Sequence, residues 1–479
     1  MQSVAAALER LGELAESPAV SRLATAFADA GHELALVGGP VRDAFLGRAV
    51  NDLDFTSDAT PDEILGIVKP ISEAHWDVGR KFGTIGAKIA GEQVEITTYR
   101  SDAYDGESRK PEVVFGDSLE DDLVRRDFTV NALALRLPER TLVDPSGGIE
   151  DLLAGILRTP AAAEQSFGDD PLRMMRAARF AAQLGFAVEP ATERAMGDLA
   201  GAIERISAER VRDEFSKLLL TADPVPGIRL LVDSGIADRV LPEIPALRLE
   251  IDEHHHHKDV YEHSLTVLRQ AIDYEVSRGT LASPDLIVRL AAILHDIGKP
   301  ATRRLEAGGA VSFHHHDVVG AKLARKRLRA LRYDNDTIAA VGRLIELHLR
   351  FFGYSDQQWT DSAVRRYVRD AGPQLERLHI LTRADVTTRN RRKADRLGFA
   401  YDDLEERIAV LAEEEELAAV RPELDGVQIQ EALGIRPGPA VGEAYRFLLE
   451  LRLDEGVIGE DAARERLLAW WAGRDGAEG

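Results

Sequence analysis

Alternating and short apolar runs in the first third of the chain predict a mixed sheet with helices between its strands. Five segments show the period-2 or short apolar pattern that is typical of strands, namely 32–39, 51–56, 84–90, 93–99 and 129–135. From about residue 169 this pattern stops, and apolar residues recur with the 3.6-residue period of helices, as in PLRMMRAARFAAQLGF and ERVRDEFSKLLL. The pattern therefore predicts an α+β head followed by all-helical domains.

Changes in the pattern divide the chain into five parts. We expect an N-terminal helix at 1–30, the α+β head at 31–158, a helical neck at 159–245, a histidine-rich helical domain at 246–395 and an acidic helical tail at 396–479. Ten of the 13 His residues lie between His254 and His348. This clustering indicates a local function in the fourth part.

Composition narrows the chemistry that the chain can perform. The absence of cysteine excludes disulfides and thiolate metal sites, so any metal must be held by His, Asp or Glu. No uncharged apolar run reaches the roughly 18 to 20 residues of a membrane span, and the N-terminus lacks a signal-peptide pattern, so we expect a cytoplasmic protein without membrane contact. The net charge of -22 argues against a non-specific polyanion coat, although local basic patches can still bind nucleic acid.

Two carboxylates, Asp52 and Asp54, lie two residues apart in a predicted strand and therefore on one face of it. Paired hard oxygen ligands suit Mg²⁺, and two Mg²⁺ ions about 3.5 to 4 Å apart could clamp the oxygens of a phosphoryl transfer. Upstream, Gly38 and Gly39 would let the backbone approach a triphosphate, and Arg42 could pair with its oxygens. An isolated Asp-x-Asp more often marks a solvated strand face, but the preceding Gly-Gly and Arg favour the phosphate site.

Other polar residues in the head allow two interpretations each. Glu95 alternates with apolar neighbours, so it could supply a third carboxylate near the metals or be an ordinary solvated acid. Arg125 and Arg126 could meet a triphosphate or form an exposed ion-pair turn.

A helix that begins near Pro171 carries a second group of candidates. Asp170 precedes it, and Arg173, Arg176 and Arg179 recur at every third position. An aspartate can accept from a cytosine amino group and an arginine can donate to base edges, so the helix could select a nucleotide without a nucleic-acid template. Alternatively, Asp170 caps the helix and the arginines are solvated.

Four segments of the chain resemble, in order, the class II tRNA nucleotidyltransferase (CCA-adding enzyme) and bacterial poly(A) polymerase family, a branch of the polymerase-beta-like superfamily. They are GGPVRDAFLGRAVNDLDFT, RRDFTVNALAL, DPSGGIEDL and DDPLRMMRAARFAAQLGF. The resemblance extends over nearly the whole chain. It implies an α+β multidomain fold, in which a polymerase-beta-like nucleotidyltransferase head with a small mixed sheet is followed by all-α neck, HD and tail domains.

The resemblance also implies roles for the candidates. Asp52 and Asp54 would hold Mg²⁺, and Asp170 and Arg173 would form an amino-acid template for CTP and ATP. The residues implied to bind the nucleotide are Gly39, Arg42, Arg125 or Arg126, Asp170, Arg173, Arg176 and Arg179. The family usually has Glu-Asp where this chain has Asp169 and Asp170, a change that affects the support of the template more than its pairing atoms.

The histidine-rich part resembles the HD domain, a family of helical metal-dependent phosphohydrolases. An apolar stripe predicts a helix that starts at Ser283 and Pro284 and ends at Gly298, with the HD pair in its last turns. The segments that carry the resemblance are His263 in VYEHSLTVL, His295 and Asp296 in LAAILHDIGKP, the run His314 to Asp317, His348 in ELHLRF, and Asp385 in TRADVTTR.

The match to the HD domain implies a metal site. One divalent cation would be held by His263, His295, Asp296 and Asp385, with His316 and His348 as candidates for a second. Imidazole and carboxylate together suit Ni²⁺, Mn²⁺, Co²⁺, Fe²⁺ or Zn²⁺, and the metal could activate water for phosphoester hydrolysis. The same site could instead serve only as a scaffold for tRNA. We expect the additional run 254–257 to be a solvated loop or to touch substrate.

Two basic clusters in the helical part could bind RNA despite the acidic total. Segment 322–332 has six cationic residues and no acid, and 389–396 adds a second cluster. The alternative is a basic helix face that is solvated or paired with the acidic tail. The expected RNA contacts are Lys322, Arg325, Lys326, Arg327 and Arg329.

The resemblance favours one reaction over its neighbours in the family. CC-adding members lack part of a loop after the strand that holds Glu95, whereas the corresponding segment 100–123 is long here. The stretch 424–456 resembles the tail of CCA-adding enzymes that carry a histidine domain, which favours tRNA. We therefore expect addition of CCA to the tRNA 3′ end from CTP and ATP, with pyrophosphate release. The alternatives are a bacterial poly(A) polymerase, or chiefly an HD phosphohydrolase with an RNA-binding head.

Overall fold

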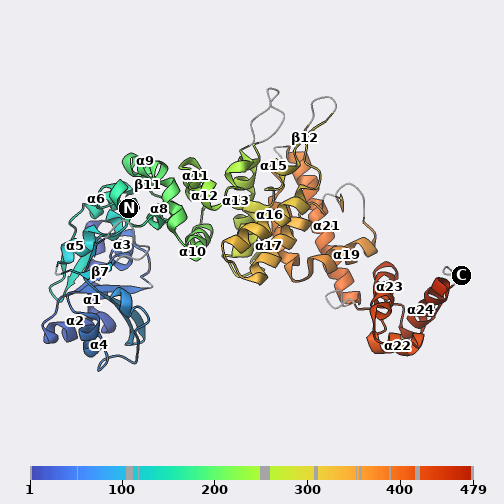
Figure 1. Cartoon of the computed structure of the whole chain (residues 1–479), viewed down its shortest axis with the longest axis horizontal. Coiled ribbons are helices and arrows are strands. Elements are labelled where there is room, and N and C mark those ends of the chain that lie inside the picture. The colour runs from blue at the N-terminus through green and yellow to red at the C-terminus, as the bar shows by residue number, and fades with distance from the viewer. Residues whose placement is uncertain are drawn as a thin grey trace. The chain divides into compact units, whose positions relative to one another are not determined.

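The computed structural model describes ten stretches of the chain, and these fall into two compact units. The units are Met1–Pro242 and Glu243–Gly479. The described stretches are 3–50, 52–103, 112–116, 118–248, 259–306, 311–351, 353–354, 359–387, 390–415 and 421–475. The predicted histidine loop 254–257 and part of the loop 100–123 lie outside them. Figure 1 shows the large sheet in the blue N-terminal part, while the green, yellow and orange parts are almost entirely helical.

A mixed sheet forms the framework of the first unit. In the described part of the chain seven strands pair in the order β3-β4-β5-β2-β1-β8-β9. The pair β2 and β5 is parallel, and the other pairs are antiparallel. The strands are β1 (Leu34–Val37), β2 (Leu53–Ser57), β3 (Ala74–Trp76), β4 (Thr84–Ile89), β5 (Glu92–Thr98), β8 (Ala134–Leu137) and β9 (Thr141–Val143). The small mixed sheet expected for the head is therefore confirmed.

Helices cover the sheet and complete the head. The single helix expected at 1–30 is two helices, because Pro18 cannot continue the first one and starts the second. The segment 100–123 begins as a hairpin of β6 (Arg100–Ala103) and β7 (Glu112–Phe115). The head helices are α1 (Val4–Glu16), α2 (Pro18–Ala30), α3 (Gly39–Leu46), α4 (Pro61–Val68), α5 (Leu119–Val124) and α6 (Gly148–Ala154).

One predicted strand is wrong over half its length. Residues Thr129–Asn131 form a 3-10 helix, and the strand begins only at Ala134. The turn is favoured because the Thr129 amide donates to the Arg158 carbonyl at 2.8 Å and the Asn131 side chain donates to Asp127 at 3.0 Å. These polar contacts outweigh the β-propensity of the segment.

The rest of the first unit is helical, apart from the short parallel pair β10 (Ile156–Leu157) and β11 (Ala187–Val188). Helix α8 (Leu172–Leu184) buries its apolar stripe and packs against α10 and α11. The α11 contact is close, because a Cβ added at Gly227 would lie 2.4 Å from the Ala178 carbonyl oxygen. The other helices are α7 (Ala163–Asp169), α9 (Pro190–Asp198), α10 (Ala208–Leu219), α11 (Val225–Asp233) and α12 (Ala237–Val240).

The second unit consists of a helical bundle and a small C-terminal cluster of helices. The bundle contains α13 (Val260–Arg278), α14 (Leu286–Leu294), α15 (Lys299–Thr302), α16 (His316–Ala330), α17 (Asn335–Leu347), α19 (Asp361–Ala371), α20 (Leu375–Ala384) and α21 (Arg391–Glu415), with a short hairpin of β12 (Arg304–Leu305) and β13 (Val311–Ser312). The predicted helix 283–298 is shorter than expected: Asp285 caps its start and it ends at Leu294, so His295 and Asp296 lie just beyond it.

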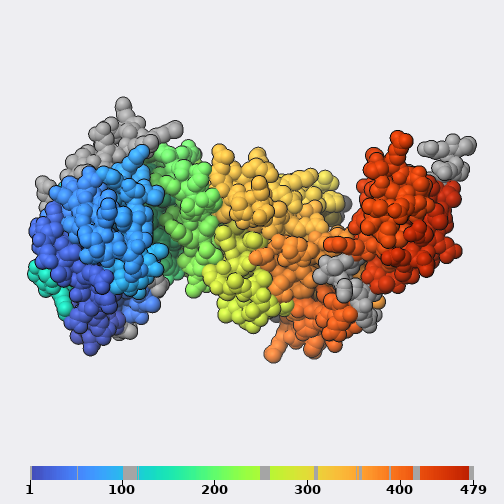
Figure 2. Space-filling model, turned by 90° about the horizontal axis from the view of Figure 1, so that it is seen from below, coloured from blue at the N-terminus to red at the C-terminus, as the bar shows by residue number. Residues whose placement is uncertain are grey.

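The C-terminal helices have a core of their own. Helices α22 (Gly426–Leu433), α23 (Pro439–Glu455) and α24 (Glu460–Asp475) bury Ile429, Leu448 and Leu467 together. These helices form the red body at the C-terminal end in Figure 2. Across the described stretches, none of the helices combines the length and the low polarity that a membrane span requires.

The close packing of α11 on α8 generates a stability prediction. We expect Gly227→Ala to lower the free energy of unfolding by about 1 to 3 kcal/mol, because the new methyl group would force the two helices apart. Urea denaturation followed by circular dichroism measures this. The matched control is Gly197→Ala in α9, where a Cβ meets nothing within 4 Å and helix propensity should improve stability slightly. Equal stability of the two variants would contradict the close contact.

Candidate active site and metal centre

A cleft of about 950 Å³ in the first unit collects every predicted head residue. Its walls come from the sheet, from the N-terminus of α3 and from helices α8 and α10. The predicted residues that line it are Gly39, Arg42, Asp52, Asp54, Glu95, Arg125, Arg126, Asp170, Arg173, Arg176 and Arg179. Residues more than 120 positions apart in the sequence therefore face one space.

Three carboxylates line the sheet side of this cleft. Asp54 in β2 is the parallel partner of Glu95 in β5, and Asp52 immediately precedes β2. Burial raises the pKa of Asp54, the Glu95 carboxylate raises it further, and Arg126 opposes the shift. Carboxylate oxygens are the donors that hard divalent cations prefer, and a cation beside Asp54 and Glu95 would offset the charge repulsion that raises the pKa of Asp54. These three residues therefore fit Mg²⁺.

The arginines next to this cluster are held by buried acceptors. Arg42 is buried and donates to the Asn131 side-chain oxygen at 2.7 Å. Arg125 and Arg126 both pair with the fully buried Asp122, at 2.8 and 3.1 Å. The alternative interpretation, an exposed ion-pair turn, is half right: both arginines form ion pairs, but their side chains are largely covered and line the cleft.

The start of α8 presents Asp170 and Arg173 to the cleft. One Asp170 oxygen accepts from the Leu172 amide at 3.1 Å, and the other accepts from Arg210 at 3.1 Å. Arg173 donates to the Ser166 hydroxyl at 2.8 Å and to the Arg125 carbonyl at 2.6 Å. Asp170 thus contacts the helix terminus, as a capping residue would, and lines the cleft as well.

Further along α8, two arginines are fixed by buried carboxylates. Arg176 lies 2.6 Å from Asp127, and Arg179 donates to Glu214 at 2.6 Å. Although burial opposes ionisation, the Arg176 guanidinium and the Asn131 amide lower the pKa of Asp127 to about 2. Arg179 also lies over the Phe180 ring at 4.1 Å. These arginines are not a solvated stripe but part of a buried polar network.

Sequence reasoning missed the acceptors of this network. Asn131 and Glu214 were not identified, although Glu214 carries a usable signal: it occupies the same helix face as buried Val211, Phe215 and Leu218. A carboxylate on an apolar stripe indicates a buried partner of opposite charge. Other unpredicted residues of the cleft wall include Thr84, Thr97, Arg100, Arg210 and Lys217.

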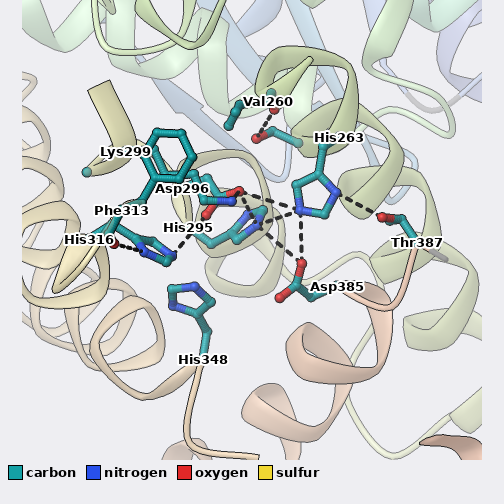
Figure 3. Close-up of polar contacts among 12 residues, drawn as sticks. Val260, His263, His295, Asp296, Lys299, Phe313, His316, His348, Asp385 and Thr387 are labelled. Carbon is teal, nitrogen blue, oxygen red and sulfur yellow. Dashed lines mark hydrogen bonds and ion pairs between the residues drawn. The ribbon is translucent and has the colours of Figure 1, made fainter. Parts of the chain in front are cut away.

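The predicted HD residues converge in the second unit (Figure 3). His263 comes from α13, His295 and Asp296 follow α14, and Asp385 follows α20. His263 lies 2.9 Å from Asp385, and His295 lies 3.3 Å from Asp296. His316, at the start of α16, lies 3.3 Å from the other oxygen of Asp296.

Two groups of three ligands can be formed from these side chains. They are His263, His295 and Asp385, and Asp296, His316 and His348. The Nδ1 atoms of His295, His316 and His348 contact backbone carbonyls at 2.8, 2.8 and 2.6 Å, which leaves Nε2 directed toward the carboxylates. Among the described residues, the buried Nε2 of His348 has no hydrogen-bond partner, and the buried Nε2 of His316 makes no hydrogen bond beyond its 3.3 Å ion contact with Asp296. This arrangement fits divalent metal ions.

Neighbouring residues complete this centre. Lys299 lies 2.6 Å from Asp296, and the Thr387 hydroxyl lies 3.0 Å from Nδ1 of His263. Burial lowers the pKa of His348 to about 4, and the adjacent His295 contributes to the shift. His348 is therefore neutral near pH 7, the form that binds metal.

The basic segment predicted to bind RNA lies on α16. Lys322, Lys326 and Arg329 are exposed. Arg325 pairs with Glu346 at 3.0 Å, and Arg327 pairs with Glu243 at 2.8 Å. The alternative interpretation expected ion pairs between this basic helix face and the acidic tail. Two of the cations are indeed ion-paired, but their partners lie outside the tail.

Comparisons with known families match three parts of the chain. Residues 34–158 match the family described as the poly(A) polymerase head domain. Residues 185–247 match a probable RNA- and SrmB-binding site of polymerase A, and residues 260–390 match the HD domain.

Curated relatives share extensive similarity with the chain. An A-adding tRNA nucleotidyltransferase from Deinococcus radiodurans is 35% identical over 447 residues, which cover 91% of this chain and 95% of that protein. A CCA-adding enzyme from Leuconostoc mesenteroides is 42% identical over 227 residues, or 47% of this chain. The matched region spans only about half of that enzyme, 54% of its length.

Solved structures resemble the fold over nearly the full length. The CCA-adding enzyme of Bacillus stearothermophilus in complex with CTP has a TM-score of 0.68 and 25% identity, covering 96% of this chain and all of that one. The Thermotoga maritima CCA-adding enzyme complexed with tRNA has a TM-score of 0.61 at 21% identity, covering 97% of this chain and 98% of that one.

The buried Asp127–Arg176 pair generates a pH prediction. Since the folded-state pKa of Asp127 is about 2, below the value of about 3.9 for an unfolded aspartate, its ionisation stabilises the fold above pH 4 and that contribution is lost as the pH falls toward 2. We expect the difference in unfolding free energy between wild type and Asp127→Asn to shrink by about 2 kcal/mol between pH 5 and pH 2. Urea denaturation at each pH measures this difference in unfolding free energy. The control is Asp198→Asn, which changes an exposed aspartate. A difference that is independent of pH would contradict the assignment.

Proposed function

Because this chain belongs to the tRNA nucleotidyltransferase and poly(A) polymerase family, we propose that it adds CCA to the 3′ end of tRNA from CTP and ATP, without a nucleic-acid template and with release of pyrophosphate. The observation that carries the proposal is one cleft that is lined by three carboxylates and by eight predicted nucleotide contacts. The expected acceptor is tRNA, because relatives named for tRNA match nearly the whole chain.

The head residues would divide the work of nucleotidyl transfer. Asp52, Asp54 and Glu95 would hold Mg²⁺, which when bound neutralises triphosphate charge and orients the attacking 3′-hydroxyl. Arg42 and the Arg125–Arg126 pair would bind the triphosphate oxygens in charge-assisted hydrogen bonds. Because buried acceptors already fix these arginines, little conformational entropy is lost when the nucleotide binds.

Asp170 and Arg173 would select the base. An ionised carboxylate can accept hydrogen bonds but cannot donate them. It therefore favours the amino groups of cytosine and adenine over the carbonyl groups of uracil and guanine. The Leu172 amide and Arg210 hold the Asp170 carboxylate in one orientation. Such a fixed acceptor can discriminate between bases because a wrong base leaves it unpaired.

A second candidate, addition of A alone, is favoured by one comparison. The relative that matches 91% of the chain is named an A-adding enzyme, whereas the CCA-adding relative from Leuconostoc mesenteroides matches about half of it. The two activities share the same head chemistry. They differ in whether CTP is used, so substrate tests separate them.

We also propose that the HD centre binds one or two divalent transition-metal ions and hydrolyses a phosphoester. Four histidines and two aspartates supply the mixed nitrogen and oxygen donors that Ni²⁺, Mn²⁺, Co²⁺, Fe²⁺ or Zn²⁺ accept. A bound ion would lower the pKa of a water ligand. Lys299, which contacts Asp296, would place a positive charge beside a substrate phosphate.

Primer extension tests the main proposal. Three tRNA transcripts, ending at the discriminator base, at C and at CC, are incubated with CTP, ATP or both in Mg²⁺. Completion to CCA on all three is the expected result. Extension of only the CC transcript would establish A addition, and long ATP-only tails would establish a poly(A) polymerase. Absence of any extension would leave the HD centre as the active site.

Asp52→Asn separates the two centres. We expect nucleotide addition to fall by about 100-fold or more, the effect of removing one group that stabilises transition-state charge, while metal binding at the HD centre is retained. Asp296→Asn should give the reverse pattern. Equal loss of both activities in either variant would show that the centres do not act separately.

Metal binding at the HD centre can be measured directly. We expect the intact protein to bind Mn²⁺ or Ni²⁺ by isothermal titration calorimetry, and we expect His295→Ala to weaken binding at least 10-fold, because it removes a ligand. Hydrolysis of bis(p-nitrophenyl) phosphate should fall in parallel. As a control, His379→Ala removes a buried histidine outside the centre. Unchanged affinity in His295→Ala would refute the proposed ligand set.

A further inference from the structure

A row of residues crosses the open face of the sheet and ends at the catalytic carboxylates. Trp76 in β3 is in register with Gly86 in β4, Gly86 with Glu95 in β5, and Glu95 with Asp54 in β2. Residues in register point to the same face of a sheet. Trp76 therefore shares a face with Glu95 and Asp54, and only a glycine lies between Trp76 and Glu95.

The missing side chain at Gly86 lets the indole lean toward the active site. A Cβ added at Gly86 would lie 2.0 Å from Nε1 of Trp76, so the ring occupies the space above this glycine. The indole is only partly buried. An aromatic surface thus adjoins the third carboxylate on the side away from Asp54.

The loop that follows β3 presents two further large apolar side chains to solvent. Val78 is 88% exposed and Phe82 is 61% exposed, values that a large apolar side chain reaches only at a cost in hydration. The loop is nevertheless held in place, because Arg100 donates to the Phe82 carbonyl at 2.9 Å. Exposed apolar groups on a fixed loop indicate a binding surface rather than a frayed segment.

The loop is continuous with the cleft. Thr84, two residues after Phe82, and Arg100 both line the cleft wall. The Thr84 hydroxyl contacts the Thr97 hydroxyl at 2.9 Å, and Thr97 lies on the same face of β5 as Glu95, about 7 Å along the strand. We name Trp76, Val78 and Phe82 the rim platform.

The charges around the rim platform suit a polyanion. Lys81 lies between the platform residues in sequence, is exposed and has no carboxylate partner in the described part of the chain. Two exposed acids of the same region, Asp62 and Asp77, share Arg80 as their partner. An aromatic surface with an available cation is the combination that single-stranded nucleic acids recognise.

We propose that the rim platform binds the single-stranded 3′ end of the RNA acceptor, with Phe82 and Trp76 stacking on its last bases and Lys81 contacting a phosphate. This inference rests on the proposed function, since it assumes an RNA 3′-hydroxyl that reaches Glu95. The incoming nucleotide would lie on the other side of the carboxylates, toward Arg42 and α8. The acceptor end therefore enters from β4 and is oriented before the reaction.

Binding of labelled RNA hairpins tests the proposed role of the rim platform directly, because it does not depend on catalysis. Two fluorescein-labelled hairpins with the same stem are compared by anisotropy, one with a blunt end and one with a three-nucleotide single-stranded 3′ overhang. We expect wild type to prefer the overhang, and we expect Phe82→Ala to weaken overhang binding about 5- to 100-fold, the factor that corresponds to losing one stacked base. Binding of the blunt hairpin should not change.

Matched variants separate stacking from loss of structure. Phe82→Trp should restore overhang binding, and Leu8→Ala, which removes a 47% exposed apolar side chain on α1, should leave it unaltered. Lys81→Met should reduce the salt dependence of binding by about 0.7 in the slope of log K against log salt, as expected for one phosphate contact to a single strand. The Trp76→Leu variant should behave like Phe82→Ala.

Two outcomes overturn the inference. One is equal overhang binding by wild type, Phe82→Ala and Trp76→Leu, and the other is an equal loss for the blunt hairpin. The proposed function is judged separately by primer extension with wild type. In that assay Phe82→Ala should raise the KM for tRNA about 5- to 100-fold while the KM for CTP stays within about twofold. If wild type extends tRNA but Phe82→Ala has normal KM values, only the rim platform is refuted.

Discussion

The buried ion pair between Asp127 and Arg176 fixes the cleft of the first unit. Asp127 belongs to the turn that precedes the 3-10 helix of the head, and Arg176 belongs to α8, so the pair joins two segments that are far apart in sequence. A buried charge without its partner costs several kcal/mol, so each residue can be placed only where the other is. Asn131 extends the constraint, because it contacts both Asp127 and Arg42. The position of Arg42, a predicted triphosphate contact, and the orientation of α8, the helix proposed to select the base, therefore depend on one interaction.

Charge separation inside the cleft follows from the same constraint. The sheet contributes the carboxylates Asp52, Asp54 and Glu95. The helical side contributes most of the arginines together with Asp170, so groups of opposite charge face each other across the cleft. Such clusters repel internally, and the structure compensates them differently. The arginines are paired with buried acids, Asp122, Asp127 and Glu214. Asp54 is only partly compensated, because Arg126 lowers its pKa while burial and the neighbouring Glu95 raise it, and the net shift is upward. A cation bound to a polyphosphate is the ligand that satisfies both walls at once.

The sequence predicted the parts of the site that local geometry decides. The alternation of apolar and polar residues in β5 was enough to predict that Glu95 points away from the core. The order of the four motifs was enough to identify the family. The sequence could not show that β2 pairs with β5 across the intervening β3 and β4, which brings Asp54 beside Glu95. It also could not reveal Asn131, whose role depends on partners in other elements. For Glu214 the apolar helix face indicated a buried charge but not which arginine it meets. Trp76 and Phe82 were missed because 71–83 has no periodic pattern, and exposure there appears only in three dimensions.

In the HD centre, the C-terminal ends of two helices orient two of the histidines. His295 and His348 occupy the C-terminal cap positions of α14 and α17, where the last carbonyl groups lack intrahelical partners. In each case Nδ1 contacts the carbonyl three residues earlier, that of Ala292 or Ile345. A carbonyl can only accept, so Nδ1 must carry the proton and Nε2 must offer its lone pair to the centre. Had α14 continued to Gly298 as its pattern suggested, the Ala292 carbonyl would accept from a backbone amide, which would compete with its contact to His295. The early end of the helix is thus what prepares the imidazoles as ligands.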